Sequence, residues 1–471
     1  MFQKILIANR GEIAVRIVRA CAEMGIRSVA VYTEADKYAL HVKRADEAHS
    51  LGSDPLAGYL NPHHIVNLAV ETGCDAIHPG YGFLSENAEL ARICAERGVV
   101  FIGPSAAVIR RMGDKTQARR AMIDAGVPVT PGSEGNLATV EEALAEAARI
   151  GYPVMLKATS GGGGRGIRRC DSEAELERNY ERVISEATKA FGNADVFLEK
   201  CIVNPRHIEV QVLADGLGNT IHLFERDCSV QRRNQKLIEI APSPQLTPEQ
   251  RAYVGELAVR AAEAVGYVNA GTVEFLLAGE QVYFMEMNTR VQVEHTITEQ
   301  ITGVDIVREQ IRIAAGLPLG YRQQDISYRG YALQLRINAE DPKNNFLPSF
   351  GHVSRYYAPG GPGVRVDTAI YTGYDIPPYF DSMCLKLIVW SLQWEEALNR
   401  AERALNDMRL QGVKTTAPYY RQILQHPDFR AGSFDTSFVD QHPELLEYSE
   451  RSRPEDIALA IAAAIAAHAG L

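Results

Sequence analysis

The chain of 471 residues has no excess of basic side chains and no paired cysteine motif. Its 49 lysines and arginines stand against 59 aspartates and glutamates, and the net charge of −10 argues against a nucleic-acid partner, which would select a basic surface. The seven cysteines are odd in number and include no Cys-x-x-Cys pair, so we expect free thiols in a reducing compartment.

Sequence signals for secretion and for membranes are also missing. The apolar run at residues 5–8 is too short for a signal peptide, and the run at residues 457–467 is too short to span a bilayer. The hydrophobic fraction of 46% is ordinary for a globular protein, and the length suggests roughly three domains. We therefore expect a cytoplasmic protein with no membrane partner.

Polar side chains occupy every second position between residues 286 and 294, with apolar or small side chains between them. On an extended strand they would share one face, and its two ends would lie about 25 Å apart, too far for one reaction centre. The row must therefore bend or serve two neighbouring tasks. A carboxylate and an amide suit a metal that carries phosphate oxygens, an arginine suits a planar anion, and a second carboxylate could take a proton. A solvated surface strand is the alternative. The row is Glu286, Asn288, Arg290, Gln292 and Glu294.

The first 113 residues alternate predicted strands and helices, which is typical of a parallel α/β sheet. Residues 4–8 and 28–32 are predicted strands, and residues 12–24 are a predicted helix. A nicotinamide-binding domain is disfavoured because its fingerprint needs three glycines, and the first turn offers only Gly11. The loop at residues 78–86 follows a strand, where open sheets place ligand crevices, although its glycines also fit plain turns.

A glycine-rich loop at residues 160–166 lies between two predicted strands. Gly161, Gly163 and Gly166 match the dinucleotide pattern formally, but the next helix begins only at Ser172 and no Lys-Ser/Thr follows the last glycine. The loop is therefore predicted to be a hairpin lid whose amides close over phosphates, with a simple mobile loop as the alternative.

A carboxylate lies inside another predicted strand, at residues 272–277. An unpaired Glu274 would be costly there, and Glu286 follows twelve residues later across a predicted turn. With Asn288, the two facing carboxylates make a good Mg²⁺ site. The basic stretch at residues 231–236 fits either a local anion site or a solvated loop.

Six pieces of sequence together resemble the biotin carboxylase members of the ATP-grasp superfamily, over essentially the whole chain. The stretch from Gln292 to His295 is similar to biotin carboxylases in particular, whereas the Glu/Glu/Asn set also occurs in other ATP-grasp ligases. The pieces are residues 8–13, 78–87, 161–166, 225–233, 286–295 and 336–342.

This resemblance implies a chain of α/β and α+β domains. A Rossmann-like parallel-sheet domain would span residues 1–113, and an ATP-grasp domain residues 114–329, with a glycine-rich lid at about 131–203. A C-terminal α+β domain behind the active site would span residues 330–446, and a tail helix residues 447–471.

The resemblance also implies ATP, Mg²⁺ (or Mn²⁺), bicarbonate and biotin as ligands and cofactors. The residues implied around the nucleotide and its metal are Lys115, Lys157, Gly161, Gly162, Gly163, Gly164, Glu199, Lys200, Ile202, His207, Gln231, Asn234, Glu274 and Glu286. The implied metal ligands are Glu274, Glu286 and Asn288. The residues implied to hold bicarbonate are Lys236, Arg290, Gln292, Val293 and Glu294.

Two residues would carry the chemistry that the resemblance implies. Glu294 would deprotonate bicarbonate, which then attacks the γ-phosphate and forms carboxyphosphate, and Arg336 would stabilise the biotin enolate. Lys236 and Arg290 would assist at the same centre. Asn234 stands where the family usually has histidine, so we expect an altered nucleotide affinity.

No Ala-Met-Lys-Met sequence occurs, so the biotin is expected on a separate partner. Residues 231–244 and the tail at residues 453–471 most resemble the biotin carboxylase component of two-subunit pyruvate carboxylases, whose partner carries the carboxyltransferase and the biotin. A homodimer within a larger hetero-oligomer is expected. The alternatives are a component of an acetyl-CoA or other acyl-CoA carboxylase, and an inactive ATP-sensing regulatory subunit, which would need a missing base or metal ligand. The tail stripe of Ile457, Ile461 and Ile465 could dock on this chain or on a partner.

Overall fold

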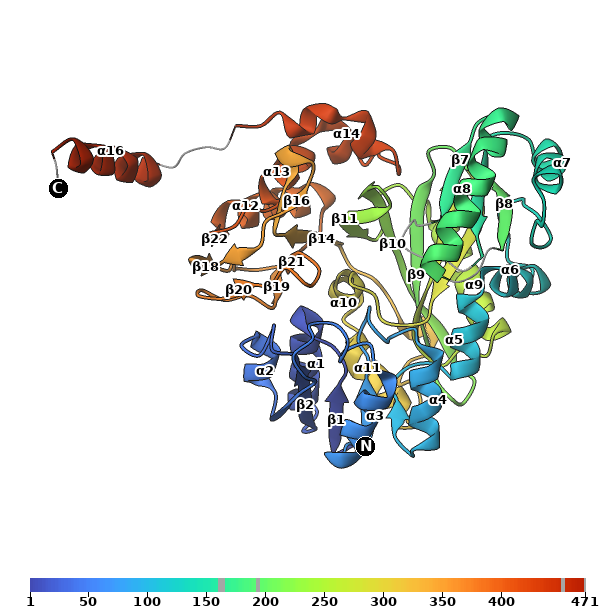
Figure 1. Ribbon diagram of the computed structural model, residues 1–471, viewed down its shortest axis with the longest axis horizontal. Helices are drawn as coiled ribbons and strands as arrows, with labels where there is room; N and C mark the ends of the chain where they lie inside the picture. Colours follow the sequence, from blue (N-terminus) through green and yellow to red (C-terminus); the bar gives the residue numbers. More distant parts are fainter. Residues whose placement is uncertain (160–165, 192–194, 450–453, 470–471) are drawn as a thin grey trace.

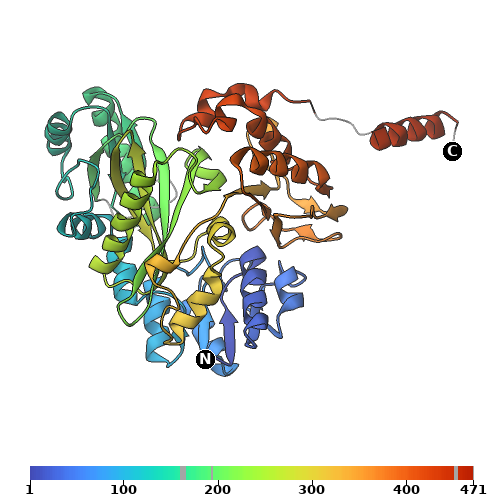
Figure 2. The ribbon, with the colours of Figure 1, turned by 180° about the vertical axis from the view of Figure 1, so that it is seen from behind.

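The computed structural model describes residues 1–159, 166–191, 195–449 and 454–469. Figures 1 and 2 show an N-terminal layer below, a central region on one side and a C-terminal region on the other. The predicted lid glycines Gly161, Gly162, Gly163 and Gly164 lie outside the described residues. Among the helices of the described ranges, none combines the length and the apolar composition that a membrane span requires.

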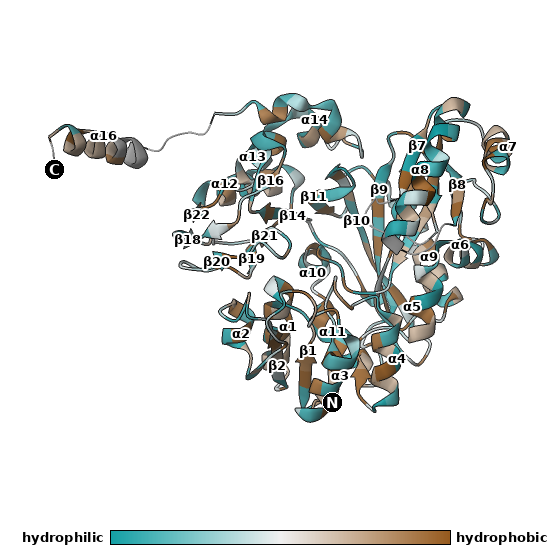
Figure 3. Ribbon diagram, in the orientation of Figure 1, coloured by the Kyte–Doolittle hydropathy of each residue, from teal (hydrophilic) through white to brown (hydrophobic). Residues whose placement is uncertain are grey.

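The N-terminal layer is the predicted parallel sheet, with strand order β3-β2-β1-β4-β5. Figure 3 shows β1 and β2 as largely apolar, which fits strands that helices cover on both faces. The strands are β1 Lys4–Ile7, β2 Arg27–Tyr32, β3 Glu47–Ser50, β4 Ala76–His78 and β5 Val100–Phe101. The helices are α1 Gly11–Glu23, α2 Leu40–Arg44, α3 Pro62–Glu71, α4 Ala88–Glu96 and α5 Ala106–Gly113.

An eight-stranded antiparallel sheet forms the centre of the molecule, in the order β13-β12-β9-β10-β11-β14-β21-β19. Its last three strands come from beyond residue 330, so the C-terminal region continues the central sheet through the pairing of β11 with β14. The strands are β9 Arg206–Ala214, β10 Thr220–Arg232, β11 Gln235–Ala241, β12 Asn269–Ala278, β13 Gln281–Asn288, β14 Tyr331–Asn338, β19 Val364–Thr368 and β21 Met383–Ser391.

A small antiparallel sheet, ordered β7-β6-β8, carries the glycine-rich segment between β6 and β7. Two helices cover it with a separate apolar core. The Asp114 carboxylate caps the next helix and accepts from the amides of Thr116 and Gln117 at 3.0 Å, as predicted. The elements of this region are α6 Lys115–Asp124, α7 Val140–Ile150, β6 Val154–Ala158, β7 Ile167–Cys170, α8 Glu173–Phe191 and β8 Val196–Lys200.

The other helices cover the central sheet, except for α16, which projects away from the body in both views (Figures 1 and 2). Ile461 and Ile465 on α16 are exposed. These helices are α9 Pro248–Ala264, α10 His295–Thr302, α11 Ile306–Ala314, α12 Trp394–Asp407, α13 Ala417–Gln425, α14 Pro427–Arg430, α15 Phe438–Gln441 and α16 Pro454–His468. Short elements are η1 Gln323–Asp325, β15 Glu340–Asp341, η2 Pro342–Asn344, β16 Leu347–Pro348, β17 Gly351–His352, β18 Arg355–Tyr357, β20 Asp375–Ile376, β22 Arg409–Gln411 and η3 Pro443–Leu446.

The shared sheet makes the core of β21 a stability determinant. Leu387 is fully buried on β21, whereas Leu392, just after that strand, is 49% exposed. We expect Leu387→Ala to reduce the free energy of unfolding by about 2–5 kcal/mol, because it leaves a cavity, and Leu392→Ala to change it little. Calorimetry of the whole chain should show a lower transition midpoint for the first variant only. Equal midpoints would mean that this part of the sheet does not limit stability.

Candidate active site

A row of charged side chains runs across the strands of the central sheet. The register places Glu286 on β13 opposite Glu274 on β12, Glu274 opposite Glu209 on β9, and Glu209 opposite Arg226 on β10. Residues directly opposite one another on paired strands share a face. The predicted pairing of Glu274 with Glu286 across a turn is therefore confirmed, and it lies within a longer row.

The Glu274 carboxylate accepts hydrogen bonds from four side chains. The donors are Lys236 at 3.1 Å, Asn288 at 2.7 Å and Gln292 at 2.6 Å on one oxygen, and His207 at 2.6 Å on the other. Burial opposes the charged form, but Lys236 and His207 outweigh it and hold the pKa of Glu274 well below its usual range. Glu274 is therefore an ionised carboxylate in the interior.

The polar row bends after Asn288, where β13 ends. Residues 289–294 form a turn, and α10 begins at His295, so the row bends, which is one of the two arrangements that the sequence predicted. The bend brings Glu294 to Lys236, whose ammonium binds Glu294 at 2.7 Å and Glu274 at 3.1 Å. Lys236 therefore joins the end of the row, Glu294, to Glu274, the carboxylate that faces the start of the row at Glu286.

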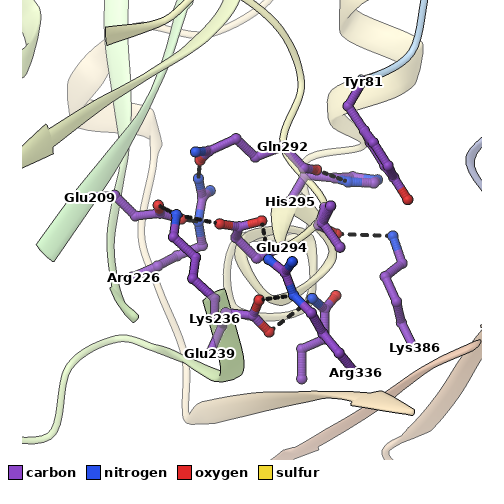
Figure 4. A network of polar contacts seen from close by, with 12 residues as sticks. Tyr81, Glu209, Arg226, Lys236, Glu239, Gln292, Glu294, His295, Arg336 and Lys386 are labelled. Carbon is purple, nitrogen blue, oxygen red and sulfur yellow. Dashed lines mark hydrogen bonds and ion pairs between the residues drawn. The ribbon is translucent and has the colours of Figure 1, made fainter. Parts of the chain in front are cut away.

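Lys236 lies among three carboxylates, because it also binds Glu209 at 2.5 Å. Figure 4 shows Lys236 with two of them, Glu209 and Glu294. Burial would lower the pKa of Lys236, but Glu209, Glu274 and Glu294 raise it well above its usual value. Lys236 therefore stays charged at neutral pH.

Arg336 on β14 binds the other oxygen of Glu294 at 3.2 Å and is held by Glu239 of β11 at 2.5 Å. Burial opposes ionisation of Glu294, yet Lys236 and Arg336 together lower its pKa strongly. The arrangement places a carboxylate between two cations, at the point where the C-terminal strands join the sheet (Figure 4).

Arg290 in the turn binds a carboxylate from the N-terminal layer. Its guanidinium contacts Glu86 at 3.0 Å and the Asn288 amide oxygen at 2.9 Å, and Glu86 also accepts from the Thr289 amide at 3.1 Å. The loop at residues 78–86 therefore anchors this site, which favours the ligand-crevice interpretation over plain turn chemistry.

The lysines expected around a nucleotide lie near the small sheet. Lys157 pairs with Glu199, while the Lys200 ammonium donates to the carbonyls of Gly151 at 2.9 Å and Tyr152 at 2.8 Å. Lys115 is the first residue of α6, at the positive end of the helix dipole. Burial lowers the pKa of Lys115, with Lys157 adding to the shift.

The remaining expected nucleotide contacts are more dispersed. Ile202, just after β8, is half-buried, and Gln231 is paired with Lys236 across the β10–β11 hairpin. Asn234 is exposed at the tip of this hairpin with φ of +62°, a left-handed conformation that asparagine tolerates well. The asparagine at this position therefore fits the turn.

Sequence reasoning missed a central arginine. Arg226 is fully buried, and its five N–H groups donate to Glu209 at 2.5 Å, Gln211 at 2.9 Å, Thr298 at 3.0 Å, Thr272 at 3.1 Å and Gln292 at 2.7 Å. The sequence signal that could have identified Arg226 is a charged residue within a predicted strand, which is the signal that identified Glu274.

The donor set fits a hard divalent cation. Burial raises the pKa of Glu286, and the neighbouring Glu274 carboxylate adds to the shift, although the Glu286 side chain still reaches solvent. Two carboxylates that repel each other, together with the Asn288 amide oxygen, are ligands of the kind that Mg²⁺ prefers. A cation between the carboxylates would relieve this repulsion.

Comparison with known protein families agrees with this geometry. The biotin carboxylase N-terminal domain matches residues 1–109, the ATP-binding domain of the carbamoyl-phosphate synthase L chain matches residues 114–322, and the biotin carboxylase C-terminal domain matches residues 334–441. The chain belongs to the biotin carboxylase family. The predicted resemblance and the predicted fold class, with its central ATP-grasp domain, are confirmed.

Individual relatives are similar to this chain over most of its length. The 2-oxoglutarate carboxylase small subunit of Hydrogenobacter thermophilus is 57% identical, with 100% of both chains covered. A crystal structure of the biotin carboxylase domain dimer of that enzyme, with MgADP, ADP and bicarbonate, has a TM-score of 0.93 at 57% identity and covers 96% of this chain and 100% of its own. The crystal structure of a biotin carboxylase subunit of pyruvate carboxylase has a TM-score of 0.83 at 57% identity, with the same coverage.

The metal assignment predicts a selective loss. Glu286→Gln should weaken Mg²⁺-dependent ATP turnover strongly, since one charged ligand is lost, while the thermal midpoint without nucleotide changes little. Glu280→Gln, on the exposed turn between β12 and β13, is the matched control and should behave as the parent chain does. Turnover would be measured across a Mg²⁺ titration, and identical curves for the two variants would contradict the assignment.

Proposed function

We propose that this chain carboxylates biotin on a separate carrier protein, using ATP and bicarbonate through a carboxyphosphate intermediate. The observation that carries the proposal is the position of Glu294 between Lys236 and Arg336, next to the Glu274–Glu286 pair. A base, an anion site and Glu274 of the metal-binding pair are thereby within one connected set of hydrogen bonds, and Glu286 faces Glu274 across the hairpin. The ligands bound in the H. thermophilus domain structure, MgADP, ADP and bicarbonate, support the same chemistry.

In this proposal the nucleotide phosphates lie near Lys115, Lys157 and His207, and Glu274, Glu286 and Asn288 hold Mg²⁺. The metal, when bound, neutralises charge on the phosphoryl oxygens. Burial lowers the pKa of His207, but Glu274 outweighs it and raises the pKa, so this histidine adds positive charge on the phosphate side. Glu199, Lys200, Ile202, Gln231 and Asn234 complete the proposed nucleotide surroundings.

Bicarbonate would be held by Arg290, Gln292, Val293 and Lys236, with Glu294 as its base. Lys236 and Arg336 both bind Glu294 in this structure, which makes that carboxylate a weak base. A bicarbonate that accepts hydrogen bonds from Lys236 releases Glu294 from one of its two cations and so raises its proton affinity. The substrate itself would thus activate the base.

Arg336 has a second role in the proposal. Glu239 holds the guanidinium at 2.5 Å, so its position does not depend on Glu294 alone. When Glu294 takes a proton its charge is lost, and Arg336 can then stabilise the oxygen of the biotin enolate, in the manner of an oxyanion-hole donor.

We further propose that the chain is the biotin carboxylase subunit of a two-subunit pyruvate carboxylase and forms a homodimer within the larger complex. The similarity to the biotin carboxylase subunit of pyruvate carboxylase supports pyruvate as the acceptor. The crystal structure of the H. thermophilus domain is that of a dimer, which supports the homodimer. The 2-oxoglutarate carboxylase small subunit, matched over the full length, makes 2-oxoglutarate the second candidate acceptor. Both acceptors are 2-oxo acids, and the partner subunit would select between them.

The base assignment is tested by Glu294→Gln. We expect biotin carboxylation to fall by about 10²–10⁴-fold, the usual contribution of a general base, with ATP binding largely retained. Glu256→Gln, on the exposed side of α9, is the control and should keep full activity. Carboxylation of free biotin would be followed with radiolabelled bicarbonate. A normal rate in Glu294→Gln would show that another group is the base.

The acceptor is tested by reconstitution with a partner that holds the carboxyltransferase and biotin domains. The mixture should form oxaloacetate from pyruvate, ATP and bicarbonate, and parallel reactions would contain 2-oxoglutarate or acetyl-CoA instead. Carboxylation of 2-oxoglutarate alone would favour the second candidate. Transfer only through a small carrier to acetyl-CoA would overturn the 2-oxo acid assignment and leave biotin carboxylation standing.

A further inference from the structure

A fully buried lysine lies behind the turn that carries Glu294. Lys386 on β21 is 0% exposed, and its ammonium pairs with Glu12 of α1 at 3.0 Å and donates to the Val293 carbonyl at 2.9 Å. Glu12 also accepts from the Tyr81 hydroxyl. In Figure 4, Lys386 and Lys236 lie on opposite sides of Glu294. Lys386 therefore links the N-terminal layer, the C-terminal region and the turn.

Two side chains fix the peptide planes of this turn. The His295 ring nitrogen Nδ1 lies 2.8 Å from the Gln292 carbonyl, and because a carbonyl can only accept, Nδ1 carries the proton. Lys386 fixes the next carbonyl, that of Val293. In a trans peptide the C=O and the following N–H point in opposite directions. The two contacts therefore set the directions of the Val293 and Glu294 amides.

Filling this buried position with a charged pair is energetically unfavourable. Burying an ammonium and a carboxylate costs several kcal/mol of desolvation, and apolar side chains of similar volume often stabilise a protein equally well. An apolar side chain, however, could not donate to the Val293 carbonyl. The hydrogen bond to the turn is thus what this buried charge provides and an apolar residue would not.

We propose that Lys386 is a positioning residue, which holds the Val293–Glu294 peptide in the orientation that bicarbonate binding requires, with Glu12 fixing the ammonium in place. The inference rests on the proposed function, since it assigns Val293 and Glu294 to bicarbonate. It adds a contribution from α1 and β21, neither of which supplies a residue that contacts the substrates in that proposal.

The test compares the parent chain with the double variant Glu12→Gln/Lys386→Met, neither of which carries an unpaired buried charge at this position. Either single substitution would leave the other charge buried without its counter-ion, which is strongly destabilising, so the parent chain is the reference and the double variant is the test variant. Loss of a charge-assisted hydrogen bond to the turn should raise the KM for bicarbonate about tenfold in the test variant relative to the reference. The KM for ATP should be unchanged, a split that a general loss of stability would not give.

Hydrogen exchange gives a second readout that does not depend on activity. Amides of residues 293–295 should exchange about tenfold faster in the test variant than in the parent chain, with unchanged exchange in β12 and β13. Equal bicarbonate KM and equal exchange in the parent chain and the double variant would overturn the positioning role. Absence of bicarbonate-dependent turnover in the parent chain would count against the proposed function instead, and the exchange result would then decide the anchoring role by itself.

Discussion

The site depends on one ammonium group, that of Lys236, which three carboxylates share. Glu209, Glu274 and Glu294 come from different parts of the chain, and without a cation among them these carboxylates would repel one another in a desolvated interior. Lys236 binds all three and keeps them close together. It joins the metal-binding part of the site to the part that carries the base.

The cost of burying so much charge is met by pairing nearly every donor with an acceptor. Arg226 uses all five N–H groups, and Glu274 accepts from four side chains. Removal of one member would leave its partners unpaired, so the network is rigid. A rigid set of dipoles needs little rearrangement when charge moves during a reaction.

The continuous sheet explains how distant segments reach one centre. Lys236 and Glu239 are on β11 and Arg336 is on the neighbouring β14, so the pairing of these strands fixes Arg336 relative to Lys236. The N-terminal layer contributes from the other side, where Glu86 binds Arg290 and Glu12 binds Lys386. Each region of the chain therefore supplies a charged side chain that pairs with one from another region.

The sequence by itself determined much of the local structure. The parallel N-terminal sheet, the Asp114 cap and the hairpin that faces Glu274 with Glu286 follow from patterns of period two or 3.6 and from turn residues, which act over a few positions. The family followed from six motifs of the same local kind.

Only the tertiary structure decided how these pieces meet. The bend after Asn288, the bonds from Lys236 to three carboxylates, the contact of Glu86 with Arg290 and the buried Lys386–Glu12 pair join residues far apart in the chain. Strand periodicity says which side chains share a face, but it does not say which strand becomes the neighbour. Charged residues that are far apart in the chain come into contact only when the whole chain packs, because the free energy of burial depends on the complete fold.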